Sequence, residues 1–201
     1  MSRVPLRRAY TRAVRILGKP TSINVRKVLW TCAELGVACE LEHWGAGFRD
    51  PNEPAFLSLN PNALVPVLVE DDFVLWESNA ICRYLAASRG AEWLLPSAPR
   101  ARAVVEQWMD WQVAELNPAW RYAFMALVRG SAAHRDPAAI AASVAQWNRQ
   151  MAILDTRLTR TGAYVAGEQF TLADVVLGLS AHRFYAAPIE RHALPALEAY
   201  C

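Results

Sequence analysis

Apolar and polar positions follow two different patterns along this chain of 201 residues. Between residues 13 and 90, short apolar runs alternate with stretches in which apolar residues recur at helical spacing. Residues 100–201 show helical spacing throughout, and the stretch 91–99 between the two patterns holds two prolines. The sequence therefore predicts a small α/β domain at 13–90, a linker at 91–99, an all-α helical bundle at 100–201 and a tail at 1–12.

The first half begins with a β-branched run, followed by a helical stretch that Gly36 closes as a left-handed cap. Two later apolar runs meet at Asp71-Asp72, which is typical of a tight hairpin. The resulting order is β-α-β followed by β-β-α, which predicts a mixed sheet with helices packed on it. The first two strands are expected at 13–17 and 37–44, and the helices at 22–35 and 78–88.

The second half begins with a long helix that runs toward Asn117-Pro118, where the proline should kink or break it. Asp136-Pro137 starts another helix, because proline suits the first helical position, and Gly162 ends it. A last helix begins near Pro195, and we expect Cys201 to cut it short. The apolar stripe of the helix that starts at Pro137 is Ile140, Val144, Trp147, Met151, Leu154 and Leu158.

Composition narrows the class of protein. The formal net charge is only +2, which gives no electrostatic reason to expect nucleic acid or an anionic membrane as a partner. No apolar stretch approaches the roughly 20 residues that a membrane span needs, and the N-terminus lacks the apolar segment of a signal peptide. The four cysteines form no C-x-x-C pair, and no Cys/His cluster has metal-site spacing. We therefore expect a cytoplasmic protein that binds no metal, nucleic acid or membrane.

The segment from residue 60 to residue 81 carries the clearest chemistry. A proline costs a strand one hydrogen-bond donor, so Pro66 belongs at the first residue of its strand, where a cis Val65–Pro66 bond is tolerated. Such a bond would turn the amide and carbonyl of Val65 outward. The second apolar run passes directly into a helix through Glu77-Ser78. Unpaired strand groups beside a helix N-terminus predict a binding site for a small anionic peptide.

A second local motif lies at Phe170-Thr171-Leu172-Ala173-Asp174. The Thr171 hydroxyl can cap the amide of Asp174, and the Asp174 carboxylate can reach back to the start of the helix. This arrangement is a capping box. Because it satisfies the helix's own backbone, we interpret it as a folding and stability element.

Together these residues resemble the glutathione transferase family, in its serine-type, theta- or zeta-like bacterial cytosolic branch. The resemblance rests on a serine before the first helix, the N-P-x-x-x-V-P-x-L segment at 60–68, the Glu-Ser pair and the F-T-L-A-D box. It implies a thioredoxin-like N-terminal domain followed by a helical C-terminal domain, usually paired as a homodimer. Family members bind glutathione, their co-substrate, on the first domain and a small apolar electrophile between the domains.

Carried over by position, the resemblance assigns a role to each motif residue. Ser22 corresponds to the serine that donates a hydrogen bond to the glutathione sulfur, and Asn24 is a second possible donor. Val65 corresponds to the residue before the cis proline Pro66. The pair that holds the γ-glutamyl end of the tripeptide corresponds to Glu77 and Ser78.

One position departs from the family pattern. Residue 64, often Lys or Gln in related branches, is Leu64 here, so this glutathione-site position offers no polar partner for the glycyl carboxylate. The alternatives are Lys27, His43, Arg49 and Asn62, and the sequence does not decide among them.

The electrophile pocket is expected beside the proline break of the long helix, with Asn117 and Trp120 as its candidates. Glu106 and Asp110, one turn apart, are either solvated charges or groups that steer the γ-glutamyl amine from across a dimer interface. The leading hypothesis is an enzyme that conjugates the glutathione thiolate to an apolar electrophile. Isomerisation, dehalogenation or peroxide reduction at the same site, and a non-enzymatic interaction module on the same fold, are the alternatives.

Overall fold

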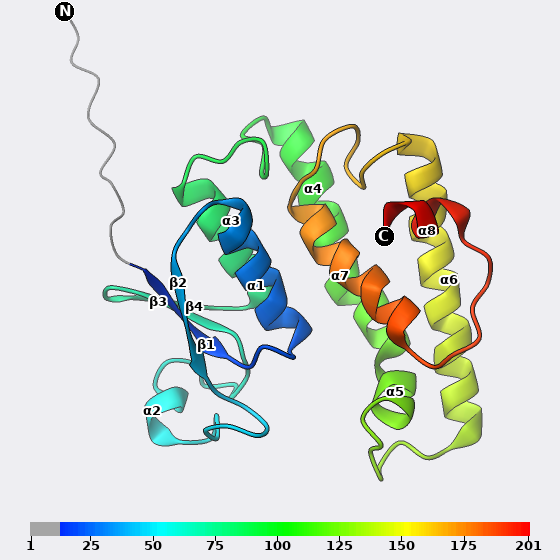
Figure 1. The fold of residues 1–201 in the computed structure, drawn as a ribbon, viewed down its shortest axis with the longest axis horizontal. Helices are drawn as coiled ribbons and strands as arrows, with labels where there is room; N and C mark the ends of the chain where they lie inside the picture. Colours follow the sequence, from blue (N-terminus) through cyan, green and yellow to red (C-terminus); the bar gives the residue numbers. More distant parts are fainter. Residues whose placement is uncertain (1–12) are drawn as a thin grey trace, which may run out of the picture. The chain divides into compact units, whose positions relative to one another are not determined.

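The computed structural model describes residues 13–201, and the predicted tail at 1–12 lies outside them (Figure 1). The chain divides into two compact units, one that ends at Ile81 and one that runs from Cys82 to Cys201. The division falls within α3 (Ser78–Ser88). The domain boundary at 91–99 therefore stays a prediction, and each unit is described by itself.

The first unit is built on a mixed sheet of four strands in the order β2-β1-β3-β4, as the sequence predicts. The central strand β1 pairs in parallel with β2 and antiparallel with β3, and β3 pairs antiparallel with β4. Asp71 turns the β3–β4 hairpin with a positive φ of 53°. The strands are β1 (Val14–Gly18), β2 (Cys39–His43), β3 (Val67–Glu70) and β4 (Phe73–Trp76).

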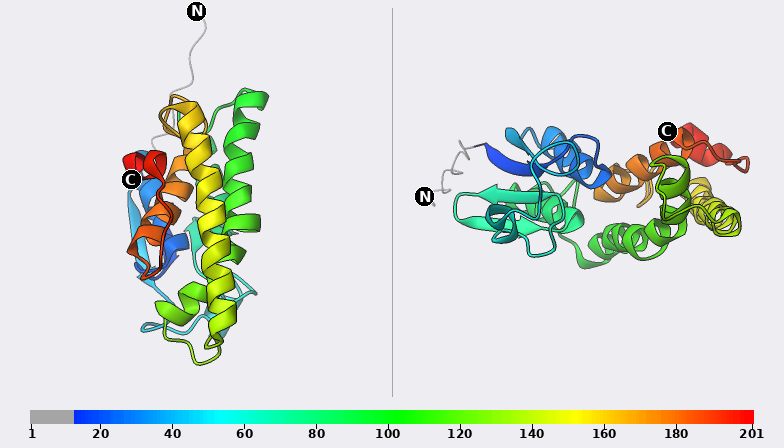
Figure 2. Two further views of the ribbon diagram at one scale, coloured as in Figure 1. Left: turned by 90° about the vertical axis from the view of Figure 1, so that its right-hand side faces the viewer. Right: turned by 90° about the horizontal axis from the view of Figure 1, so that it is seen from below.

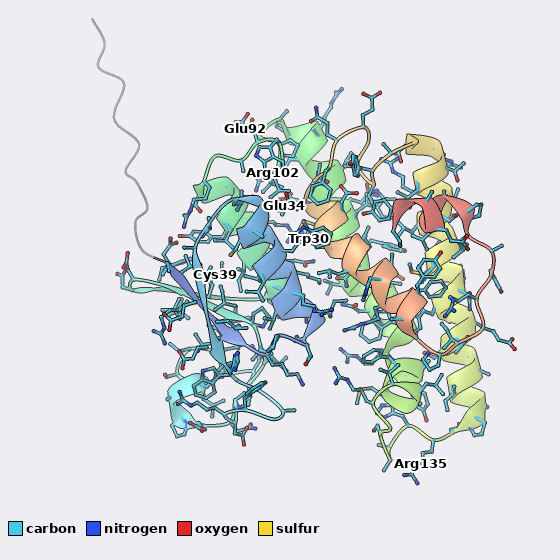
Figure 3. The ribbon with its side chains drawn as sticks, in the orientation of Figure 1. Trp30, Glu34, Cys39, Glu92, Arg102 and Arg135 are labelled. Atoms are coloured by element: carbon cyan, nitrogen blue, oxygen red, sulfur yellow. The ribbon has the colours of Figure 1, made fainter. Side chains whose placement is uncertain are left out.

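Helix α1 (Ile23–Glu34) follows β1 after a sharp turn. A side chain at Gly18 would place its Cβ 2.4 Å from Val25 Cγ2, so this close approach of strand and helix requires glycine. One turn apart on α1, Trp30 Nε1 donates to Glu34 Oε1 at 2.8 Å (both residues are labelled in Figure 3). Helix α2 (Pro54–Leu57) contributes Phe56 to a core cluster that also contains Leu17 of β1 and Val67 of β3.

The buried face of α1 differs from the stripe that periodicity predicts. Apolar spacing indicates a buried stripe that includes Leu29, but Leu29 is only partly buried. Lys27 and Thr31 are buried in the stripe instead. The cause is hydrogen bonding: Lys27 Nζ donates to Asn79 Oδ1 at 3.2 Å, and Thr31 Oγ1 donates to the Lys27 carbonyl at 2.9 Å.

The second unit is helical throughout, as predicted (Figure 2). Helices α5 and α8 pack against the long helix α6, and α4 packs against α7. None of the helices within residues 13–201 is long and apolar enough to cross a membrane. The helices are α4 (Pro99–Trp111), α5 (Asn117–Leu127), α6 (Pro137–Thr161), α7 (Leu172–Ala186) and α8 (Pro195–Tyr200).

The predicted break at Pro118 is present, but it takes the form of a π-helical turn at Gln112–Leu116 between α4 and α5. Pro118 then occupies the first turn of α5, where its missing N–H has no cost. The buried side chain of Gln112 donates to Asn117 Oδ1 at 2.9 Å and to Ser180 Oγ at 3.3 Å. These bonds hold the wider turn in place.

The start of α7 contains the predicted capping box. The Thr171 amide donates to Asp174 Oδ2 and the Val165 amide donates to Asp174 Oδ1, each at 2.8 Å. The Thr171 hydroxyl also donates to Oδ2 and the Tyr200 hydroxyl to Oδ1, each at 3.0 Å. Asp174 is 1% exposed, and this burial raises the pKa of its carboxyl. One carboxylate thus joins a loop, a helix start and the terminal helix.

Candidate functional site

A cavity on the first unit collects most of the residues that the sequence analysis singles out. Three segments supply its lining: the start of α1, the loop before β3 and the start of α3. The predicted residue Ser22 is not part of the lining. The lining residues are Asn24, Asn60, Asn62, Leu64, Val65, Pro66, Glu77 and Ser78.

The loop before β3 presents main-chain groups to this cavity. The Val65–Pro66 peptide bond is cis. Within the described part of the chain, neither the amide nor the carbonyl of Val65 has a hydrogen-bond partner. Val67, which follows Pro66, is buried and pairs with Leu17 of β1. Backbone polar groups that border a cavity without a partner are suited to a ligand with a peptide backbone.

The start of α3 combines a helix N-terminus with an acidic side chain. The Glu77 carbonyl accepts the first helical hydrogen bond, from the Ile81 amide at 2.9 Å. Glu77 has a φ of 70°, in the left-handed region that glutamate rarely adopts. Ser78 follows as the first residue of the helix. The positive end of the helix and the Glu77 carboxylate lie beside each other, which suits a group with both an anion and an ammonium.

The start of α1 carries the two residues that the sequence analysis names as candidate thiol donors, Ser22 and Asn24. Ser22 is the residue before the helix and has extended backbone angles, with φ −76° and ψ 126°. Serine at this position commonly caps its helix, but the Ser22 side chain makes no capping hydrogen bond. Asn24, the second residue of α1, lines the cavity. The hydroxyl of Ser22 is therefore not used by its own helix.

One residue of the cavity was missed by sequence reasoning. Asn60 is 2% exposed, and its Nδ2 donates to the Leu64 carbonyl at 2.8 Å. Its Oδ1 accepts from both the amide and the side chain of Asn62, at 3.0 Å each. An asparagine that precedes a proline and bonds to the residue two positions later is a local turn signal, and that signal was available in the sequence.

The electrophile candidates Asn117 and Trp120 touch each other on the second unit. Trp120 Nε1 donates to Asn117 Oδ1 at 3.1 Å, and the same oxygen accepts from Gln112. The Trp120 ring meets Phe124 edge-on at 5.3 Å, and the Arg183 guanidinium lies 4.4 Å from its centroid. These contacts fix the orientation of the Trp120 ring, and a role in binding an electrophile stays a prediction.

The acidic pair on α4 has partners within the second unit. Arg83 contacts Asp110 through Nη2 and lies 3.8 Å from Glu106 Oε1 through Nε. Arg102 Nε donates to the same Glu106 oxygen at 3.0 Å. Both carboxylates are thus engaged by arginines of their own unit.

Comparison with known proteins identifies the family of this chain. Models of the glutathione S-transferase N-terminal and C-terminal domains match residues 12–87 and 137–201. Glutathione S-transferase GstB of Escherichia coli K12 is 40% identical over 166 residues, which cover 82% of this chain and 79% of that protein. The chain belongs to the glutathione S-transferase family. Glutathione S-transferase 3 of Zea mays is 35% identical over 168 residues, 80% of this chain and 73% of the maize protein.

Solved structures of glutathione transferases support the same conclusion. The theta class enzyme of the citrus canker pathogen Xanthomonas axonopodis pv. citri, with glutathione bound, has a TM-score of 0.87 and 41% identity. The match covers 93% of this chain and 89% of that one. A glutathione S-transferase from Pseudomonas fluorescens has a TM-score of 0.82 and 29% identity, over 94% and 92% of the two chains. The theta class match agrees with the branch that the sequence indicates.

Proposed function

We propose that this glutathione transferase binds glutathione in the cavity of its first unit, ionises the thiol and conjugates the thiolate to a small apolar electrophile. One observation carries the proposal: the unpaired main chain of Val65 and the start of α3 border the same cavity. A γ-linked tripeptide offers complementary groups to both. The comparisons do not favour a non-enzymatic interaction module.

The γ-glutamyl end is assigned to the start of α3. Its carboxylate would accept hydrogen bonds from the Ser78 hydroxyl and from the first amides of the helix, whose dipole favours an anion. Its ammonium group would donate to the Glu77 carboxylate, a charge-assisted bond. The strained φ of Glu77 fits this role, because strain of this kind persists where the fold requires a particular geometry.

The cysteinyl residue is assigned to Val65. An extended peptide can add to exposed strand groups by exchanging main-chain hydrogen bonds, and Val65 offers one donor and one acceptor. Leu64 and Pro66 complete this part of the cavity. This pairing would hold the cysteine side chain in one orientation, which lowers the entropic cost of the later reaction.

The sulfur is assigned to the start of α1. A free thiol has a pKa of about 8.5 and is mostly protonated at neutral pH. Lowering that pKa by two units requires about 2.7 kcal/mol of interaction with the charged form. One hydroxyl donor to an anion contributes roughly 1.5–3 kcal/mol, and the helix end adds roughly 0.3–1 kcal/mol. Ser22 as donor, with Asn24 as the second candidate, is therefore sufficient.

In the reaction, the thiolate attacks an electrophilic carbon and a carbon–sulfur bond forms. Where the electrophile carries a leaving group, that group departs with the bonding electron pair. The thiol proton has already passed to solvent, and Ser22 stays a hydrogen-bond donor that is not consumed. We further propose that Asn117 and Trp120 contact the electrophile, that two copies form a homodimer, and that the protein works in the cytoplasm, where thiols stay reduced.

The deciding experiment replaces Ser22 with alanine. Retention on glutathione-agarose and turnover of 1-chloro-2,4-dinitrobenzene are measured for the wild type, Ser22→Ala and Asn24→Ala, with thiolate absorbance titrated against pH. We expect Ser22→Ala to keep binding glutathione, to raise the pKa of the bound thiol and to lower turnover at least about tenfold, equivalent to about 1.4 kcal/mol.

Ser58→Ala is the matched control, because Ser58 Oγ donates to the Ala55 carbonyl at the end of α2, away from the cavity lining. It should behave as wild type. Wild-type turnover in Ser22→Ala together with a loss in Asn24→Ala would move the donor role to Asn24. A wild-type protein that is not retained on glutathione would refute the proposed function itself.

A further inference from the structure

Glutathione has a second carboxylate, at its glycyl end, and the residue expected to receive it is apolar here. The Leu64 side chain is 63% exposed and offers no hydrogen bond. If glutathione binds as proposed above, some other group must compensate this negative charge, because a carboxylate that loses water without a new partner costs affinity. The structure places the four candidates in very different surroundings.

Two of the candidates lie away from the cavity. Lys27 is 1% exposed, and its ammonium donates to Asn79 Oδ1 within the core. The His43 ring packs against Phe48, with the ring centroids 4.5 Å apart. Neither side chain is part of the cavity lining.

Arg49 is also engaged. Its guanidinium pairs with Glu42 at 3.1 Å and with Glu53 at 3.2 Å, and it stacks over the Trp44 ring at 3.7 Å. Three simultaneous contacts hold this side chain at the β2 end of the sheet, outside the cavity lining. Asn62 is the remaining candidate, and it is exposed and lines the cavity.

Asn62 is held in a defined position. Asn60 Oδ1 accepts both the main-chain amide and Nδ2 of Asn62. The buried Asn60 is fixed in turn by its own bond to the Leu64 carbonyl, and its carbonyl accepts the Ala63 amide at 3.2 Å. A side-chain amide has two N–H groups. One of those on Asn62 serves Asn60, and the second remains for a ligand.

We propose that Asn62 receives the glycyl carboxylate of glutathione through this second N–H, and that Asn60 is the positioning residue that holds Asn62 for it. Where related branches often have Lys or Gln at residue 64, this pair would supply a short amide that is fixed in advance. A fixed donor loses little rotamer freedom when the ligand binds. The donor is also neutral, so the contact depends on hydrogen bonding and only weakly on long-range attraction.

The test compares glutathione with its glycine monoethyl ester, which differs only at the group in question. Dissociation constants of both ligands are measured by calorimetry for the wild type, Asn62→Ala and a matched control. We expect the wild type to prefer the acid by about tenfold or more, the usual effect of a hydrogen bond to a charged group. In Asn62→Ala this preference should fall to about one, while the affinity for the ester stays the same.

The matched control is Asn52→Ala. Asn52 repeats the geometry of Asn62, since its amide and its Nδ2 both donate to Asp50 Oδ1, at 3.0 and 2.8 Å. It is not part of the cavity lining. Its replacement should leave the preference for the acid at the wild-type value.

The preference of the wild type for the acid should also change little between about 0.01 and about 1 M salt, where the Debye length falls from about 30 to about 3 Å.

Asn60→Ala tests the positioning role. A purely structural loss would weaken the acid and the ester by the same factor, whereas loss of positioning lowers the preference for the acid toward that of Asn62→Ala. The double variant should then lose no more preference than either single variant. If Asn60→Ala does not fold, Asn62→Ala still decides the assignment.

The outcomes separate this inference from the function on which it rests. A wild type that binds neither ligand overturns both. An Asn62→Ala protein that keeps the wild-type preference for the acid overturns the assignment to Asn62 and leaves the proposed function standing. A preference that collapses with added salt also overturns it, because it assigns the contact to a cation.

Discussion

The starts of α3 and α7 carry the same residue types in different surroundings. Each places a hydroxyl and a carboxylate within the first turn or directly before it. At α7, Thr171 and Asp174 are almost fully buried and their polar groups satisfy the protein's own backbone. At α3, Glu77 is exposed and adopts a strained φ, and with Ser78 it borders a cavity.

The difference shows that a helix N-terminus can serve stability or binding, but the same amides cannot serve both at once. A capping box consumes the donors that an anionic ligand would need. The protein closes α7 with its own side chains, and the proposed function assigns the start of α3 to a ligand. Variants at the two starts should accordingly change different measured quantities.

The largest effect is expected at the start of α7, on the free energy of unfolding. Asp174→Ala removes the acceptor of the Val165 and Thr171 amides and leaves both unsatisfied in the core. Because each such group costs about 1–3 kcal/mol, the free energy of unfolding should fall by about 3 kcal/mol or more. Denaturant unfolding measures this loss, and the affinity of the folded protein for glutathione should stay unchanged.

Asp136→Ala is the control for capping alone, since Asp136 caps only the Ala138 amide at the exposed start of α6. Its cost should be about 1 kcal/mol. A similar cost for Asp174→Ala would contradict the central role of this carboxylate.

Burial raises the pKa of Asp174, so the folded state holds a proton there more tightly than the unfolded chain. The advantage of wild type over Asp174→Asn should therefore shrink as pH rises from below the ordinary Asp pKa through the raised value.

An intermediate effect is expected at the start of α3, on the affinity for glutathione. Glu77→Gln keeps the shape of the side chain and removes the charge that would pair with the γ-glutamyl ammonium. Affinity for glutathione should fall about tenfold, the loss expected for one charge-assisted hydrogen bond, with unfolding unchanged. Glu53→Gln, at the residue directly before α2, is the matched control and should bind normally. Equal losses in the two variants would show that general negative charge matters and not the position of Glu77.

The sequence predicts features that depend on short separations. The capping box at Thr171 is a contact between residues three positions apart, and the break at Pro118 follows from the proline alone. The cavity residues Val65, Glu77 and Ser78 were identified because local motifs and the family resemblance coincide there.

Features that depend on distant neighbours were not predicted. Lys27 lies in a helix whose apolar spacing leaves it on the surface, yet Asn79, far along the chain, provides an acceptor that lets it be buried. Arg83 pairs with Asp110 across 27 positions in the same way. Asn60 is different, because its bonds are local and only their burial depends on the surrounding fold.

The smallest effect should also have the opposite sign. Asparagine tolerates positive φ better than glutamate, so Glu77→Asn should relieve strain and raise the free energy of unfolding by about 0.5–1 kcal/mol. The same change shortens the side chain and removes its charge, so glutathione affinity should fall. Asp71→Asn, at another residue with positive φ but outside the cavity lining, should gain stability without losing affinity. A loss of stability in Glu77→Asn alone would mean that the carboxylate supports the fold, and α3 would then resemble α7.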